Sequence, residues 1–303
     1  NTYVFATRLG GVVIFDKNGK IHRIINKRSQ LQNENVRFVF SDTEDGLWMA
    51  LDDGIARAEI SSPVSIYSEI MGVKGAVSDV IKFENTLYIT TTQGIFSFNS
   101  QANNSENNNR CFNPVKNISS QSWDLLDLNN NPENKILLAA TTDGVYKIEE
   151  NKAGLINNSY SFKLHQSKKN PQRIFVGTYN GLLSGRFENN KWIEEGMLDG
   201  TDSEIRSISE DENGNLFIGM PFLGVAAIRF CDDCANETDT VYETSWHQKY
   251  VIDKFDTSNG LPNLVWNTVF ESSGGILVGT FKGLYSFDYS HRKFIPEHRF
   301  GKQ

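Results

Sequence analysis

Two cysteines, Cys231 and Cys234, stand three residues apart in the sequence, and His247 follows thirteen residues after the second. A pair at this spacing can close a small disulfide, act as a redox pair or supply half of a zinc site. The next histidine, His291, lies too far along the chain for the usual spacing of zinc ligands. We expect a disulfide between Cys231 and Cys234, with two thiols or a metal site as the alternatives, and a lone thiol at Cys111.

Motifs that carry catalysis are absent from the sequence. It contains no G-x-S-x-G nucleophile elbow, no H-E-x-x-H metal motif and no G-x-x-x-x-G-K-S/T phosphate loop. The segment Ser209–Gly214 resembles the start of a calcium-binding loop, but Met220 occupies the position of the closing glutamate. We therefore expect a hairpin turn at Ser209–Gly214, and no catalytic residue, bound metal or cofactor in this chain.

Aromatic and basic side chains recur at one position of a repeated apolar segment. Such a mixture suits a sugar, because rings offer flat apolar faces and Arg or Asn offers hydrogen bonds. The alternative is that Trp123 and Trp266 only pack inside the fold. In six successive segments the residues at this position are Arg37, Ser78, Trp123, Lys163, Arg206 and Trp266, and Asn267 follows the last.

These segments belong to a repeat that runs along the whole chain. Each repeat has a short apolar strand, a polar turn, a glycine and a second apolar strand, and the mean period is about 45 residues. Glycine suits the tight turn between the two strands because it tolerates positive φ. No helical periodicity of 3.6 residues is sustained. The marker glycines are Gly11, Gly54, Gly94, Gly144, Gly181, Gly224 and Gly283.

This period predicts an all-β protein, a β-propeller of seven blades with four antiparallel strands each, folded as a single domain over residues 1–303. The recurring aromatic and basic residues would then lie on inner strands near one mouth of the central channel. Turns between second and third strands would reach the same face, where Tyr179, Phe222 and Phe281 extend the candidate binding site.

Two long spacings between marker glycines indicate insertions, at 99–110 and from Cys231 to Tyr242, and we expect both to be surface loops. The first repeat lacks an inner strand. Either the two chain ends complete that blade or further sequence does.

The composition excludes several function classes. The formal net charge is −7 and the sequence forms no basic stripe, so we expect neither nucleic-acid binding nor attachment to an anionic membrane surface. No apolar run approaches the roughly 20 residues that span a bilayer.

Three segments resemble a known repeat more closely than a generic propeller does. They are Leu31–Trp48, Ser203–Gly219 and Asn259–Thr280, which carry a Gly-Leu-Pro-type turn, an Asp-x-x-Gly turn or a strand of the Leu-Trp-Ile-Gly-Thr type. This pattern resembles the two-component regulator propeller repeat. The resemblance implies an ectodomain of a bacterial hybrid two-component sensor, which responds to glycan fragments through a dimeric arrangement in the full-length protein.

We therefore expect a non-enzymatic sensor module, periplasmic or extracellular, that binds a small molecule such as an oligosaccharide and is a fragment of a larger protein. One alternative is a metal-assisted propeller lyase, lactonase or glycosidase, in which Asp79, Asp124 and Asn267 would hold the metal. The other is a scaffold for protein interactions.

Overall fold

A computed structural model describes residues 2–60, 67, 69–98, 111–128, 135–231, 234 and 240–300. In this part of the chain, antiparallel strands form seven sheets, joined by turns and three short 3-10 helices. The chain divides into two compact units, residues 1–73 with 99–112 and residues 74–98 with 113–303. The predicted insertion at 99–110 lies outside the described residues.

The first unit contains two sheets of three strands, whose facing apolar residues form one core around Val12, Ile14, Leu47 and Met49. The first sheet has three strands, as the sequence indicated for a first repeat that lacks an inner strand, and the second shows three of the predicted four. In the second of them, the chain that follows β6 falls on residues 61–66, outside the described range. The strands are β1 (Thr2–Ala6), β2 (Val12–Asp16), β3 (Ile21–Ile25), β4 (Val36–Ser41), β5 (Gly46–Leu51) and β6 (Gly54–Glu59), with 3-10 helices η1 (Lys27–Ser29) and η2 (Glu69–Met71).

The second unit contains five sheets, of which four have the predicted four strands. The first three are, in chain order, β7 (Val77–Phe83), β8 (Thr86–Thr91), β9 (Gly94–Phe98) and β10 (Phe112–Pro114); β11 (Ser122–Leu128), β12 (Ile136–Thr141), β13 (Gly144–Glu149) and β14 (Lys152–Asn157); and β15 (Ser161–Gln166), β16 (Arg173–Thr178), β17 (Leu182–Glu188) and β18 (Lys191–Met197).

The next sheet has five strands because the predicted insertion after Cys231 adds a short strand to its outer edge, a correction to the expected count of four. Its strands are β19 (Ser207–Glu210), β20 (Leu216–Met220), β21 (Gly224–Cys231), β22 (Tyr242–Glu243) and β23 (Lys249–Phe255). The last sheet follows the 3-10 helix η4 (Thr257–Asn259) and contains β24 (Thr268–Ser272), β25 (Gly275–Thr280), β26 (Gly283–Asp288) and β27 (Lys293–Pro296).

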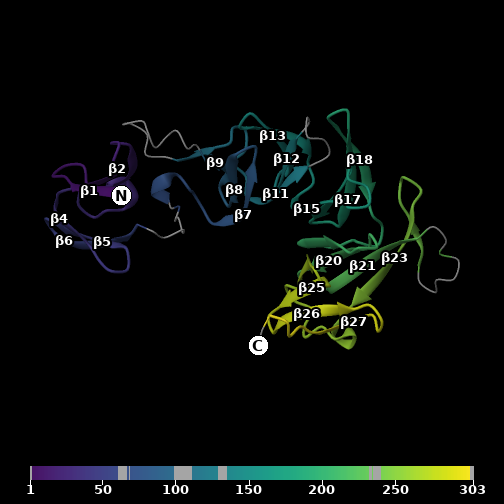
Figure 1. Ribbon diagram of the computed structural model, residues 1–303. Coiled ribbons are helices and arrows are strands. Elements are labelled where there is room, and N and C mark those ends of the chain that lie inside the picture. The colour runs from purple at the N-terminus through teal and green to yellow at the C-terminus, as the bar shows by residue number, and fades with distance from the viewer. Residues whose placement is uncertain are drawn as a thin grey trace. The chain divides into compact units, whose positions relative to one another are not determined.

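Consecutive sheets of the second unit contact each other through their first strands, in the order β7, β11, β15, β19 and β24. Figure 1 labels the first three of these strands. Side chains on one first strand accept hydrogen bonds from the backbone of the next. Asp79 accepts from the Leu125 N–H at 2.9 Å, and Asp124 accepts from the Leu164 N–H at 2.8 Å. Apolar residues fill each space between consecutive sheets. This blade-on-blade packing confirms the β-propeller fold class.

All seven marker glycines adopt positive φ, from 74° at Gly11 to 151° at Gly54. In several repeats a threonine at the end of the preceding strand donates its hydroxyl to the carbonyl of that glycine. Thr141 and Gly144 form this bond at 2.8 Å, as do Thr178 and Gly181. The turn that the sequence predicted is therefore a recurring hydrogen-bonded element.

Candidate functional site

The first strands of four sheets share an irregularity near their beginning. The pairing with the second strand skips one residue in β4, β7, β11 and β15, between Val36 and Phe38 and at equivalent points elsewhere. A bulge of this kind bends the strand and changes the direction of a side chain. The skipped residues are Arg37, Ser78, Trp123 and Phe162.

A pocket of about 440 Å³ lies where the first strands of the second unit begin. Four of the predicted column residues help to line it, and this pocket is the candidate functional site. Its lining residues are Ser78, Asp79, Trp123, Asp124, Phe162, Lys163 and Arg206.

Arg206 is surrounded by aromatic rings. Its guanidinium carbon lies 3.8 Å from the ring centre of Phe162, 4.6 Å from that of Trp123 and 5.6 Å from that of Trp266. All three distances fall within the range of a cation–π interaction. Glu204 also forms an ion pair with Arg206. The arginine is thus held in place while a quarter of its side chain stays exposed, at 27%.

The two carboxylates of the pocket already have partners in the fold. Asp124 is almost fully buried and accepts a hydrogen bond from Lys163 Nζ at 2.6 Å in addition to the one from the Leu164 N–H. Burial raises the pKa of Asp124, whereas the charge and hydrogen bond of Lys163 act in the opposite direction. Asp79 holds the backbone of Leu125. Both aspartates therefore join neighbouring blades.

Two of the predicted site residues have a buried polar atom that lacks a hydrogen-bond partner within the described residues, and of the two only Trp123 lines the pocket. These atoms are the indole nitrogen of Trp123 and the side-chain oxygen of Asn267. The amide nitrogen of Asn267 donates to the Asn263 carbonyl at 2.8 Å. An unpartnered donor and an unpartnered acceptor are groups that a bound ligand or water can satisfy.

The remaining predicted site residues are not part of the lining of this pocket. Trp266 is half exposed and contacts Phe222, with 6.1 Å between ring centres. Tyr179 stacks on Tyr160, and Phe281 is largely exposed. Trp266, Phe222, Tyr179 and Phe281 do not line the pocket. Arg37 lies in the first unit, where it forms an ion pair with Asp52.

Phe162 is the site residue that the sequence alignment missed. The comparison of the repeats placed Lys163 at the position equivalent to Trp123. The strand register instead places Phe162 at the bulge and pairs Lys163 with Gly177. The sequence offers one signal for this register, because Phe162 rather than Lys163 continues the aromatic character of the column.

The Cys231–Cys234 pair forms a disulfide, with 5.9 Å between the Cα atoms. His247, which follows this pair in the sequence, is exposed and forms a hydrogen bond with Glu243 at 3.1 Å. Cys111 is buried, and burial raises the pKa of its thiol. Among the residues that the structure describes, no group of three or more His, Cys, Asp or Glu side chains is arranged to hold a metal ion.

None of the helices in the described ranges has the length and apolar character to span a bilayer.

No protein-family model matches the sequence, and no curated protein matches it. Among solved structures, the chain is similar to the extracellular domain of a protein described as a hybrid two-component system from B. thetaiotaomicron. The identity is 20% and the TM-score 0.66, over 98% of this chain and 38% of that one.

A second extracellular domain from B. thetaiotaomicron, of a protein described as a one-component system, matches at 19% identity and a TM-score of 0.41, over 82% of this chain and 37% of that one. Virginiamycin B lyase from Staphylococcus aureus matches at 9% identity and a TM-score of 0.48, over 87% of this chain and 84% of that one. The chain thus spans well under half the length of the two extracellular domains. The first similarity supports the propeller fold and agrees with the repeat resemblance found in the sequence.

Proposed function

We propose that this chain is an extracytoplasmic, non-catalytic sensor module of a bacterial two-component signalling protein. Two observations support the proposal: the resemblance of three segments to the two-component regulator repeat, and the structural similarity to an extracellular domain of such a system. In this proposal the chain is part of a longer protein that acts as a homodimer, and its output domain lies outside the chain.

We propose an oligosaccharide as the ligand and the pocket at the start of the first strands as its site. The observation that carries this is the group of rings around Arg206, formed by Trp123, Phe162 and Trp266. Ligand sites combine apolar and aromatic surface with a few fixed polar groups. Lys163 and Arg206 supply those polar groups beside the rings. Ligand binding would act by favouring one of two pre-existing dimer arrangements.

The metal-assisted enzyme is the less favoured alternative. It requires carboxylates that converge on one ion with their oxygens available. Asp79 and Asp124 instead accept hydrogen bonds from the backbone of the next blade, and Asp124 is paired with Lys163. These roles support a structural assignment for both residues.

A thermal-shift and calorimetric screen against oligosaccharides tests the proposed site. We expect one glycan class to raise Tm, because a ligand at about 100 times its Kd stabilises the folded state by roughly 2.7 kcal/mol. Trp123→Ala should weaken binding of that glycan by at least tenfold. Trp48→Ala is the matched control, since Trp48 is a partly exposed tryptophan outside the pocket, and it should leave the affinity unchanged.

Equal loss of affinity in both variants would place the site elsewhere. A rise in Tm with divalent metal alone, and with no glycan, would favour the enzyme. No response to any glycan or metal, together with capture of a protein partner, would favour a scaffold.

A further inference from the structure

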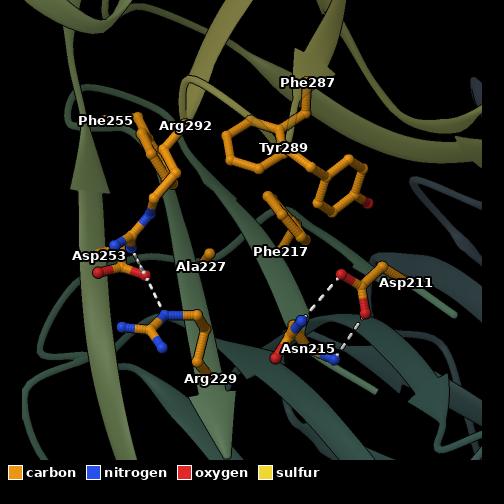
Figure 2. Close-up of a pocket in the computed structure, with 10 residues that line it drawn as sticks. All are labelled: Asp211, Asn215, Phe217, Ala227, Arg229, Asp253, Phe255, Phe287, Tyr289 and Arg292. Atoms are coloured by element: carbon orange, nitrogen blue, oxygen red, sulfur yellow. Dashed lines mark hydrogen bonds and ion pairs between the residues drawn. The ribbon is translucent and has the colours of Figure 1, made fainter. Parts of the chain in front are cut away.

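A second pocket, of about 210 Å³, lies between the sheets β19–β23 and β24–β27. Its floor is apolar, with Phe217 and Ala227 nearly fully buried. Asp253 lies at one side, where it pairs with Arg229 at 2.6 Å and with Arg292. Figure 2 shows this charged group on one side, the rings of Phe217, Phe287 and Tyr289 on the other, and the short side chain of Ala227 between them.

The preceding seam, between the sheets β15–β18 and β19–β23, has the same framework. Phe175 pairs with Ser184 across β16 and β17, as Phe217 pairs with Ala227 across β20 and β21. Arg186 stands five residues after its marker glycine Gly181, as Arg229 does after Gly224.

The buried acids of the two seams are also equivalent. Glu195 lies on β18 beside Ser184 and bonds to two arginines, Arg173 and Arg186, at 2.8 Å each. Asp253 lies on β23 opposite Ala227 and likewise pairs with two arginines.

The two seams differ in what fills them. In the preceding seam the indole of Trp246 covers Arg173, with 3.9 Å between the guanidinium carbon and the ring centre, and packs against the core that contains Phe175. Trp246 comes from the long connection between β21 and β23. The corresponding connection between β26 and β27 runs only from Tyr289 to Arg292. The ring of Tyr289 that it supplies lines one side of the pocket and leaves a space of about 210 Å³.

We propose that this seam pocket binds a neutral planar aromatic group of indole size, in the manner in which the preceding seam holds Trp246. The size fits, because a cavity of about 150 Å³ accommodates benzene and this one is larger. The charge fits a neutral ligand, since Arg229 and Arg292 are balanced by Asp253 and Asp211. An aromatic ring stacked on an arginine that is ion-paired with a carboxylate gains a cation–π interaction and apolar contact.

Titration calorimetry of the whole chain with indole tests the proposal. We expect saturable binding by the wild type. Ala227→Val fills the space between the rings and the arginines, and Arg292→Gln removes an exposed guanidinium from the turn; each should weaken indole binding at least tenfold. Arg292→Gln also keeps the test valid if Ala227→Val fails to fold. Cyclohexanol, a non-aromatic probe of similar size, should bind at least tenfold more weakly than indole.

Trp123→Ala is the control, because Trp123 lines the other pocket, and it should leave indole binding unchanged. Failure of indole binding can therefore be distinguished from failure of the proposed oligosaccharide site. N-acetyl-tryptophanamide distinguishes the source of the ring: binding at the strength of indole indicates an aromatic side chain of a peptide, and much weaker binding indicates a free aromatic compound. Absence of indole binding, variants within twofold of the wild type, or equal binding of cyclohexanol would overturn the proposal.

Discussion

Glu195 shows how a single buried acid is kept charged in this fold. Its side chain is 2% exposed and accepts hydrogen bonds from Arg173, Arg186 and the Ser184 hydroxyl. Burial would raise the pKa of Glu195, but these hydrogen bonds outweigh it and hold the pKa below its ordinary value of 4.5. The charged form is therefore favoured by folding.

This depressed pKa predicts a stability that depends on pH. Because the folded pKa is lower than the unfolded one, the contribution is complete above about pH 4.5 and is lost as the pH falls through the folded pKa. Glu195→Gln should reduce the free energy of unfolding by about 2 kcal/mol at pH 7, and the difference from the wild type should shrink below pH 4.5. Urea unfolding at a series of pH values measures both effects.

Glu188→Gln is the matched control for Glu195→Gln. Glu188 pairs with the same Arg186 at 2.7 Å, but nearly half of its side chain is exposed. Exposed pairs contribute about 1 kcal/mol or less. A loss as large as that of Glu195→Gln would contradict the role assigned to burial.

At the scale of the element, the turn with a marker glycine is the most regular feature of the chain. Positive φ explains why glycine recurs there, but the space around each glycine differs. A Cβ on Gly144 would lie 2.1 Å from the Asn157 carbonyl oxygen, whereas on Gly94 its nearest neighbour, the Ile118 oxygen, would be 3.2 Å away. The backbone of the outer strand thus approaches Gly144 far more closely.

Alanine at these two glycines should separate backbone strain from close approach. Both replacements place a side chain at positive φ, 139° at Gly144 and 113° at Gly94, so both should destabilise the protein. Gly144→Ala should cost about 1–3 kcal/mol more than Gly94→Ala because the outer strand must move. Equal losses in chemical unfolding would show that φ alone determines the preference for glycine.

The bulges in the first strands mark a limit of pattern reading at this scale. The apolar character of the segments predicted where the first strands lie, and the structure confirms strands at β4, β7, β11, β15, β19 and β24. Two of them begin later than expected, because β19 starts after Arg206 and β24 starts after Trp266 and Asn267. Pairing with the second strand determines which residue the bulge skips. In β15 the comparison of the repeats was displaced by one position, so it selected Lys163 in place of Phe162.

For the whole molecule, a single domain over residues 1–303 stays a prediction. If the chain is one domain, unfolding should be one cooperative step with no populated intermediate. Far-UV circular dichroism and tryptophan fluorescence should then give coincident urea curves, and Trp48→Phe should leave the fluorescence midpoint in place. Trp48 lies in the first compact unit and the other four tryptophans lie in the second. Two separated transitions would show instead that the units fold independently.

The sequence by itself determined the fold class, the repeat and the turns at the marker glycines, because a glycine at positive φ and a short apolar strand each depend on only a few neighbouring residues. Only the tertiary structure decided which side chains meet. Arg206 gathers rings from β11, from β15 and from the segment before β24, and Asp253 pairs with Arg292 from the next sheet. These contacts join residues roughly 40 to 80 positions apart, and they depend on strand register and on the packing of one sheet against the next.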